Sequence, residues 1–236
     1  MTVPQPVTAH EALVARLRAR LAAGAAADGP PLPGHAAHAE MAPFPGRMAP
    51  DVIGVDGKNG RTAATLVLLY PDASGEPCVV LTQRQPGLRA HSGQISLPGG
   101  AAEPGESPEA TACREAFEEV GAVLTPADVL GRLTPLYVPP SGFSVWPVVA
   151  ALAARPAFCP QEAEVAAVIE VTVARLVDPA ARRSRVRALA GTPAAVAGAD
   201  TFDVPFFAVG EGAATHEVWG ATAMMLAEFA AVAAAR

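Results

Sequence analysis

The feature that most constrains this chain is a short stretch, residues 100–122, in which acidic residues recur at helical spacing. Glu115, Glu118 and Glu119 stand at i, i+3 and i+4, so a helix would place their three carboxylates on one face. Like charges at this spacing destabilise a helix, and burial adds to the cost unless a cation neutralises them. Mg2+ and Mn2+ prefer carboxylate oxygens and retain water molecules that a substrate phosphate can replace. The pattern therefore indicates a divalent-metal site, against the alternative of an acidic helix face exposed to water.

The residues around these glutamates predict the ends of the helix. Ser107 followed by Pro108 is typical of a helix start, with a hydroxyl at the N-cap and proline at the first helical position. Gly121 is suited to end the helix in the left-handed conformation. Upstream, Pro98-Gly99-Gly100 predicts a tight corner. We therefore expect a helix of about three turns that follows a glycine corner.

The whole stretch resembles the signature of the Nudix hydrolases, G-x5-E-x7-R-E-U-x-E-E-x-G-U, in which U is aliphatic. The residues that fill its positions are Gly100, Glu106, Arg114, Glu115, Ala116, Glu118, Glu119, Gly121 and Ala122. The resemblance implies an α/β fold, the Nudix-type α/β/α sandwich with a mixed β-sheet. It also implies that Mg2+ or Mn2+ is held by Glu115, Glu118 and Glu119. The Gly99 or Gly100 carbonyl would lie nearby, and Arg114 would hold the glutamates in place, through Glu106 in one interpretation.

A second element, residues 81–100, immediately precedes the helix and reads LTQRQPGLRAHSGQISLPGG. Arginines beside a metal-binding helix suit phosphate oxygens, because a guanidinium donates paired, charge-assisted hydrogen bonds. The alternatives are a salt bridge on the sheet for Arg84 and a surface or capping role for His91.

This element resembles L-L-T-x-R-x-x-x-L-R-x-H-x-G-Q-x-x-F-P-G-G, which is found in the coenzyme A pyrophosphatase branch of the family. The matching residues are Leu81, Thr82, Arg84, Leu88, Arg89, His91, Gly93, Gln94, Pro98, Gly99 and Gly100, while Val80 and Leu97 depart from the pattern but stay apolar. The resemblance implies cleavage of coenzyme A, or a derivative, to 4′-phosphopantetheine and adenosine 3′,5′-bisphosphate. The residues that it assigns to substrate binding are Arg84, Arg89, His91 and Gln94.

The general base is open between two positions. In some members of the family a glutamate of the signature, here Glu115, takes the proton, and in others a carboxylate from a later loop does. Glu162 and Glu164 precede an apolar run in PQEAEVAAVIEV, and we favour Glu164 as an added metal ligand or base. The catalytic candidates are therefore Glu115, Glu164 and Arg114.

Other functions must be weighed beside this one. A Nudix hydrolase of another nucleoside diphosphate, such as ADP-ribose, is opposed by the second element alone. A nucleotide-sensing module without hydrolysis would be indicated by lost signature glutamates, and none is lost. The net charge of −6 disfavours nucleic acid, including capped RNA, and a membrane surface as partners. The expected partner is a small coenzyme A-type molecule, and a homo-oligomer is left open.

Hydrophobic periodicity gives the coarse architecture. We expect an N-terminal helix and a Pro/Gly-rich, irregular connector in residues 1–45 and the Nudix hydrolase domain in residues 46–236. The three cysteines form no zinc pattern, which favours buried free thiols in a reducing, cytoplasmic compartment. Apolar and β-branched runs predict strands at 64–70, 78–84, 94–97, 129–138, 143–152, 164–171, 201–208 and 215–218, and helices at 10–23 and 221–234.

Overall fold

The computed structural model describes residues 7–43, 61–86, 93–139, 141–188, 201–210 and 215–235. Within these residues the central feature is an eight-stranded sheet with the order β3-β2-β1-β7-β5, in which β4, β6 and β8 pair with β1, β7 and β2. Its strands are β1 (Thr62–Pro71), β2 (Pro77–Arg84), β3 (Ile95–Ser96), β4 (Gly99–Ala101), β5 (Val129–Arg132), β6 (Leu136–Val138), β7 (Phe143–Ala151) and β8 (Val165–Thr172).

The sheet is mixed, because β1 runs parallel to β7 and antiparallel to β2 and β4. Successive residues of β1 enter different cores: Leu66 and Leu68 belong to one apolar cluster, and Val67 and Leu69 belong to another. A strand that is buried on both faces favours apolar side chains at nearly every position, which explains the run Leu66–Leu69 in the sequence.

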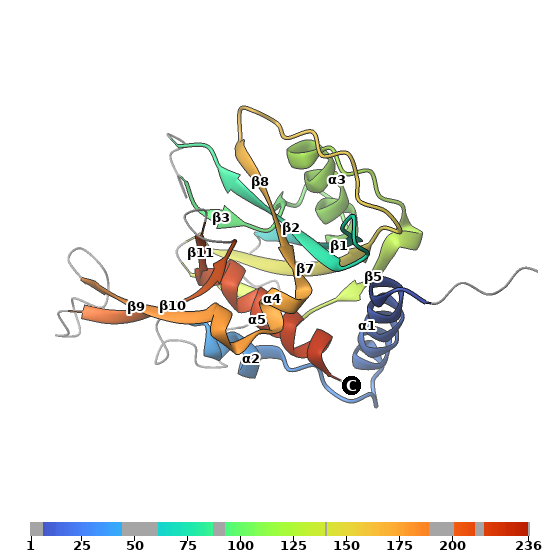
Figure 1. Ribbon diagram of the computed structural model, residues 1–236, viewed down its shortest axis with the longest axis horizontal. Helices are drawn as coiled ribbons and strands as arrows, with labels where there is room; N and C mark the ends of the chain where they lie inside the picture. The colour runs from blue at the N-terminus through green and yellow to red at the C-terminus, as the bar shows by residue number, and fades with distance from the viewer. Residues whose placement is uncertain are drawn as a thin grey trace, which may run out of the picture.

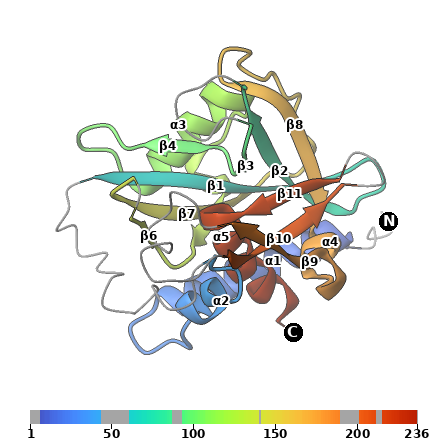
Figure 2. The ribbon, with the colours of Figure 1, turned by 90° about the vertical axis from the view of Figure 1, so that its left-hand side faces the viewer.

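Helices cover both faces of the sheet (Figures 1 and 2). On one face lies α3 (Pro108–Val120), whose Ala112, Ala116 and Val120 complete the cluster that contains Leu66. On the other face lie α1 (Ala9–Ala25) and α5 (Gly220–Ala234). The predicted α/β/α sandwich with a mixed sheet is confirmed. The shorter helices are α2 (Gly34–Glu40), α4 (Val173–Val177) and the 3-10 turns η3 (Pro126–Asp128) and η4 (Pro179–Ala181).

The N-terminal segment is more regular than predicted. Leu13, Leu17 and Leu21 of α1 are buried in the same core as α5, so the helix packs on the sheet. The connector after it was expected to be irregular, and this is wrong for α2. His38 on α2 lies 2.9 Å from the buried carboxylate of Glu228 on α5, and this long-range contact gives no local signal in the sequence.

Three further strands, β9 (Arg182–Ala188), β10 (Thr201–Val209) and β11 (His216–Trp219), form a separate antiparallel sheet. The sequence predicted β10 and β11 but not β9, whose arginines conceal the usual apolar alternation. The single strand predicted for residues 129–138 is instead divided into β5 and β6. Pro135 lies at the break, where it has no N–H to donate to a ladder.

Candidate functional site

The helix that carries the signature begins and ends where the sequence predicts. The Ser107 hydroxyl accepts a hydrogen bond from Ala110 N at 3.2 Å, and Pro108 occupies the first turn. Gly121 ends α3 with φ of 72°, in the left-handed region. A Cβ at this position would lie 3.0 Å from Cys159 Cβ, so glycine also lets the segment before β8 approach the helix end.

The predicted glycine corner is a short strand, β4, that pairs with β1 and brings the sheet up to α3. A Cβ on Gly99, whose φ is 156°, would lie 2.4 Å from the carbonyl oxygen of Ala64. A Cβ on Gly100 would lie 2.5 Å from the carboxylate of Glu115. At Gly99 the added Cβ would meet backbone, so glycine is required by close approach. At Gly100 it would meet only the Glu115 carboxylate, which lies directly against the backbone of the corner.

Arg114 binds three carboxylates of the signature at once. Its Nε and Nη2 donate to the two oxygens of Glu106 at 2.8 and 3.0 Å. Its Nη1 donates to Glu115 at 2.9 Å and to Glu118 at 3.0 Å. The hydrogen bonds from Arg114 lower the pKa of Glu106 to about 2. The guanidinium thus offsets the repulsion that the sequence spacing creates.

Glu119 is the most deeply placed carboxylate of the group. Its side chain is 6% exposed, and among the described residues its Oε2 has no hydrogen-bond partner. Arg84 Nη1 on β2 lies 3.9 Å from its Oε1. Burial raises the pKa of Glu119 to about 7, although the nearby Arg84 charge opposes this. Burial likewise raises the pKa of Glu115.

The two acidic residues proposed before β8 lie at the end of β2, where Gln85 N donates to Glu164 O at 2.8 Å, directly after Arg84. The charge of Glu164 adds to the burial that raises the pKa of Glu115 and of Glu119. The Glu162 carbonyl accepts a hydrogen bond from the Gln85 side chain at 2.8 Å. Four carboxylates, Glu115, Glu118, Glu119 and Glu164, therefore lie near the corner of β4 and the end of β2.

The predicted substrate-binding residues are only partly described. Arg84 lies at the end of β2 beside Glu119. Gln94 precedes β3, and its carbonyl accepts a hydrogen bond from Arg84 N at 3.0 Å, so the two residues are neighbours. Arg89 and His91 lie outside the described residues, and their roles stay predictions. Gln85 was not predicted, because nothing in an isolated glutamine before a proline indicates which backbone it binds.

The residues fit a divalent cation once the arginine contacts are considered. In the described part of the chain, no three His, Cys, Asp or Glu side chains form a ready-made metal cluster. Instead, Arg114 Nη1 lies between Glu115 and Glu118 and donates to both. Glu118 is 55% exposed, so turning it away from the guanidinium costs little. Glu119 Oε2, buried and without a hydrogen-bond partner among the described residues, has the unmet demand for positive charge that a cation supplies.

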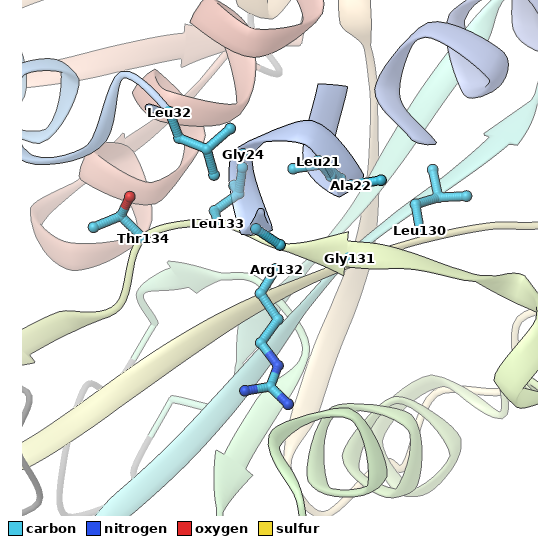
Figure 3. A pocket seen from close by; sticks show the side chains of 10 residues that line it. Leu21, Ala22, Gly24, Leu32, Leu130, Gly131, Arg132, Leu133 and Thr134 are labelled. Carbon is cyan, nitrogen blue, oxygen red and sulfur yellow. The ribbon is translucent and has the colours of Figure 1, made fainter. Parts of the chain in front are cut away.

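Features elsewhere do not compete with this site. A cavity of about 370 Å3 lies between the end of α1 and β5, lined by residues that include Leu21, Gly24 and Gly131 (Figure 3). None of its lining residues belongs to the carboxylate group.

The prediction that all cysteines are buried is wrong, since Cys159 is exposed where its segment crosses the end of α3. No helix in the described ranges is both long and apolar enough to cross a membrane.

Comparison with known proteins assigns this arrangement to a family. The model of the NUDIX domain matches residues 60–189, which is more than half of the chain. The chain therefore belongs to the Nudix family, and this part of the prediction is confirmed.

Individual proteins of the same family are similar to this chain at modest sequence identity. The chain is 35% identical over 175 residues to the Arabidopsis thaliana protein named Nudix hydrolase 22, chloroplastic, covering 73% of this chain and 55% of that protein. It is 45% identical over 112 residues to the uncharacterized Nudix hydrolase NudL of Pectobacterium atrosepticum, covering 47% of this chain and 57% of that one. The chain thus spans little more than half the length of these curated relatives. A MutT/nudix family protein from Enterococcus faecalis aligns with a TM-score of 0.42 and 23% identity, over 48% of this chain and 43% of that one.

Proposed function

We propose that the protein is a Nudix pyrophosphohydrolase that cleaves the diphosphate of coenzyme A, or of a derivative, with Mg2+ or Mn2+. The products are 4′-phosphopantetheine and adenosine 3′,5′-bisphosphate. The observation that carries the hydrolytic assignment is the buried Glu119 carboxylate beside Glu115 and the glycine corner. The choice of coenzyme A rests on the resemblance of residues 81–100 to the coenzyme A pyrophosphatase element.

The proposed ion is held by Glu115, Glu118 and Glu119, with the backbone of Gly100 beside them. When bound, such an ion offsets the charge of the diphosphate and lowers the pKa of an attacking water. Arg114 aligns Glu115 and Glu118 through one nitrogen and is itself fixed by Glu106. Its role is therefore to hold the carboxylates in register on α3.

Substrate phosphates are bound by basic groups at the end of β2 and in the residues after it. Arg84 lies within reach of Glu119, so a phosphate that meets the ion also meets this guanidinium. Arg89, His91 and Gln94 belong to the same sequence element and are proposed to bind the rest of the substrate.

Two carboxylates can take the proton from water. The Glu115 carboxylate already accepts a hydrogen bond from Arg114 and is proposed as a ligand of the ion, so both of its roles are taken. Glu164 is exposed, and among the described residues no side chain binds its carboxylate. We therefore assign the general base to Glu164 and leave Glu115 as a ligand of the ion.

The assignment is tested by incubating the purified protein with coenzyme A and either Mg2+ or Mn2+, with a parallel reaction on ADP-ribose. We expect stoichiometric 4′-phosphopantetheine and adenosine 3′,5′-bisphosphate, no product in the presence of a chelator, and slower turnover of ADP-ribose. Turnover of ADP-ribose with coenzyme A left intact would retain the hydrolase and reject the substrate.

A further inference from the structure

The tight turn from Gln161 to Glu164 is anchored on one side to the helix of the signature. Within it, Glu164 N donates to Gln161 O at 2.9 Å. Gln161 N donates to Glu119 O at 2.9 Å, and Cys159 N donates to Val120 O at 2.8 Å. These acceptors lie in the last turn of α3, where carbonyls lack partners inside the helix. The start of the turn is therefore fixed to the C-terminal end of α3, the helix that carries the proposed metal ligands.

The other side of the turn is anchored by one residue at the end of β2. Gln85 N donates to Glu164 O at 2.8 Å, which extends the ladder between β2 and β8. The side-chain Nε2 of Gln85 donates to Glu162 O at 2.8 Å. Within the described residues, Gln85 is the side chain from outside the turn that binds its backbone. Its two hydrogen bonds thus span the turn on either side of Ala163.

The position of the Glu164 carboxylate depends on this backbone. Among the described residues no side chain holds the carboxylate itself, while the backbone of Glu164 is bound by Gln85 N, next in the chain to Arg84, whose guanidinium reaches Glu119 at 3.9 Å. An exposed side chain without a partner is directed only by the conformation of its own backbone and by its rotamer. Whatever fixes the turn therefore fixes the point from which the Glu164 side chain extends toward the other carboxylates.

We propose that Gln85 is a positioning residue that acts through Glu164. Its side-chain amide and its backbone N–H hold the turn so that the Glu164 carboxylate faces the reacting end of the site. This inference rests on the proposed function, and it adds a residue that the sequence motif leaves unassigned. A misplacement of about 1 Å in such a group is enough to slow a reaction markedly.

The test uses Gln85→Met, which keeps the length of the side chain and removes the donor. Residues that orient a reacting group typically cost about 10- to 100-fold in activity when lost, so we expect kcat to fall about tenfold with KM little changed. Loss of a general base costs roughly 100- to 10,000-fold, and we expect Glu164→Gln to lie in that range. In the Glu164→Gln background, Gln85→Met should change kcat by less than about twofold, because the group it positions is already gone.

A second measurement follows the turn without catalysis. Amide hydrogen exchange in the ion-free protein should accelerate at Glu164 and Val165 in Gln85→Met, but not in the control Gln83→Met two residues earlier on β2. Unaltered exchange in Gln85→Met, or an equal loss of kcat in both backgrounds, overturns the positioning role alone. If the wild-type protein cleaves ADP-ribose instead of coenzyme A, the same comparison on ADP-ribose tests Gln85. A wild-type protein that cleaves neither rejects the proposed function itself.

Discussion

At the scale of single residues, Glu118 and Glu119 serve the proposed ion rather than the fold. We expect Glu118→Gln and Glu119→Gln each to lower kcat by at least about 100-fold, because the lost charges stabilise a bound cation and the transition state. Glu109 on the same helix pairs with Arg132, away from the group, so Glu109→Gln is the matched control and should stay near wild type. Steady-state kinetics at saturating Mg2+ decides this, and unchanged kcat in Glu119→Gln contradicts the assignment.

The buried Glu119 carboxylate also predicts that the stability of the folded protein depends on pH. Burial raises the pKa of Glu119 from 4.5 to about 7 in the folded chain, so between these values the folded state holds a proton that the unfolded state releases. The contribution of Glu119 to the unfolding free energy is therefore greatest below pH 4.5 and falls as the pH rises to 7. In a chelator, Glu119→Gln should exceed wild-type stability at pH 8 by on the order of 1–3 kcal/mol and match it near pH 5.

Urea unfolding of both proteins at the two pH values measures this difference directly. A stability gap that is the same at pH 5 and pH 8 would show that Glu119 does not carry the effect. A protein that is more stable but inactive is the signature expected of a group whose burial serves function.

At the scale of elements, substitutions at the two glycines of β4 are expected to have different effects: one lowers stability and the other lowers activity. Alanine at Gly99 places its Cβ against the backbone oxygen of Ala64, which cannot yield, and we expect a loss of about 2–4 kcal/mol. Alanine at Gly100 meets the mobile end of the Glu115 side chain instead. We expect Gly100→Ala to remain folded and to lose about tenfold in kcat, because Glu115 is displaced. Urea midpoints and kcat of both variants test the contrast, which fails if Gly100→Ala is fully active.

The corner also shows what local sequence can predict. Both ends of α3 follow from Ser107 and Gly121, since capping depends on residues within one turn. The spacing of the glutamates likewise fixes which carboxylates share a face. The resemblance to the family implied the role of Arg114, and its contact with Glu118 is local to the helix. The hydrogen bonds from Gln85 to the segment before β8 could not be derived in this way, because they depend on how β2 and β8 meet in three dimensions.

The N-terminal helix α1 was predicted, but α2 was not, for the same reason. Glu228 on α5 is fully buried and accepts hydrogen bonds from Gly34 N, from Thr134 N and from the Thr134 hydroxyl, beside His38. Each partner is distant in sequence, so the residues around α2 alone predict an irregular connector. Such a contact ties three parts of the chain to one carboxylate.

This cluster gives a prediction on stability. Glu228→Ala leaves several buried donors without an acceptor, and we expect a loss of about 3–5 kcal/mol of unfolding free energy. The control Glu76→Ala removes an exposed carboxylate and should cost less than about 0.5 kcal/mol. Chemical unfolding of the two variants measures their unfolding free energies. Similar values for both would show that the hydrogen bonds of Glu228 do not hold α2 in place.

At the scale of the whole molecule, β9 is a strand that its own residue pattern does not predict. Its arginines lie over aromatic rings: Arg182 is 5.6 Å from the ring centre of Phe207, and Arg187 is 4.9 Å from that of Trp219. The sequence presents the strand as polar because the apolar partners come from β10 and β11. The two-sided core, by contrast, could be predicted, since strands buried on both faces carry nearly continuous apolar runs such as Leu66–Leu69 of β1.

The last prediction concerns the substrate, to which the whole second element contributes. If Arg89 binds the 3′-phosphate of coenzyme A, Arg89→Ala should raise KM for coenzyme A by roughly 10- to 100-fold, the usual worth of a charged hydrogen bond. KM for dephospho-coenzyme A, which lacks that group, should change by less than about threefold. Arg155→Ala, which removes an exposed partner of Glu170, is the control and should leave both values alone. Equal losses on the two substrates would mean that Arg89 acts on a part they share, such as the diphosphate, and recognition of the 3′-phosphate would have to be sought elsewhere in the chain.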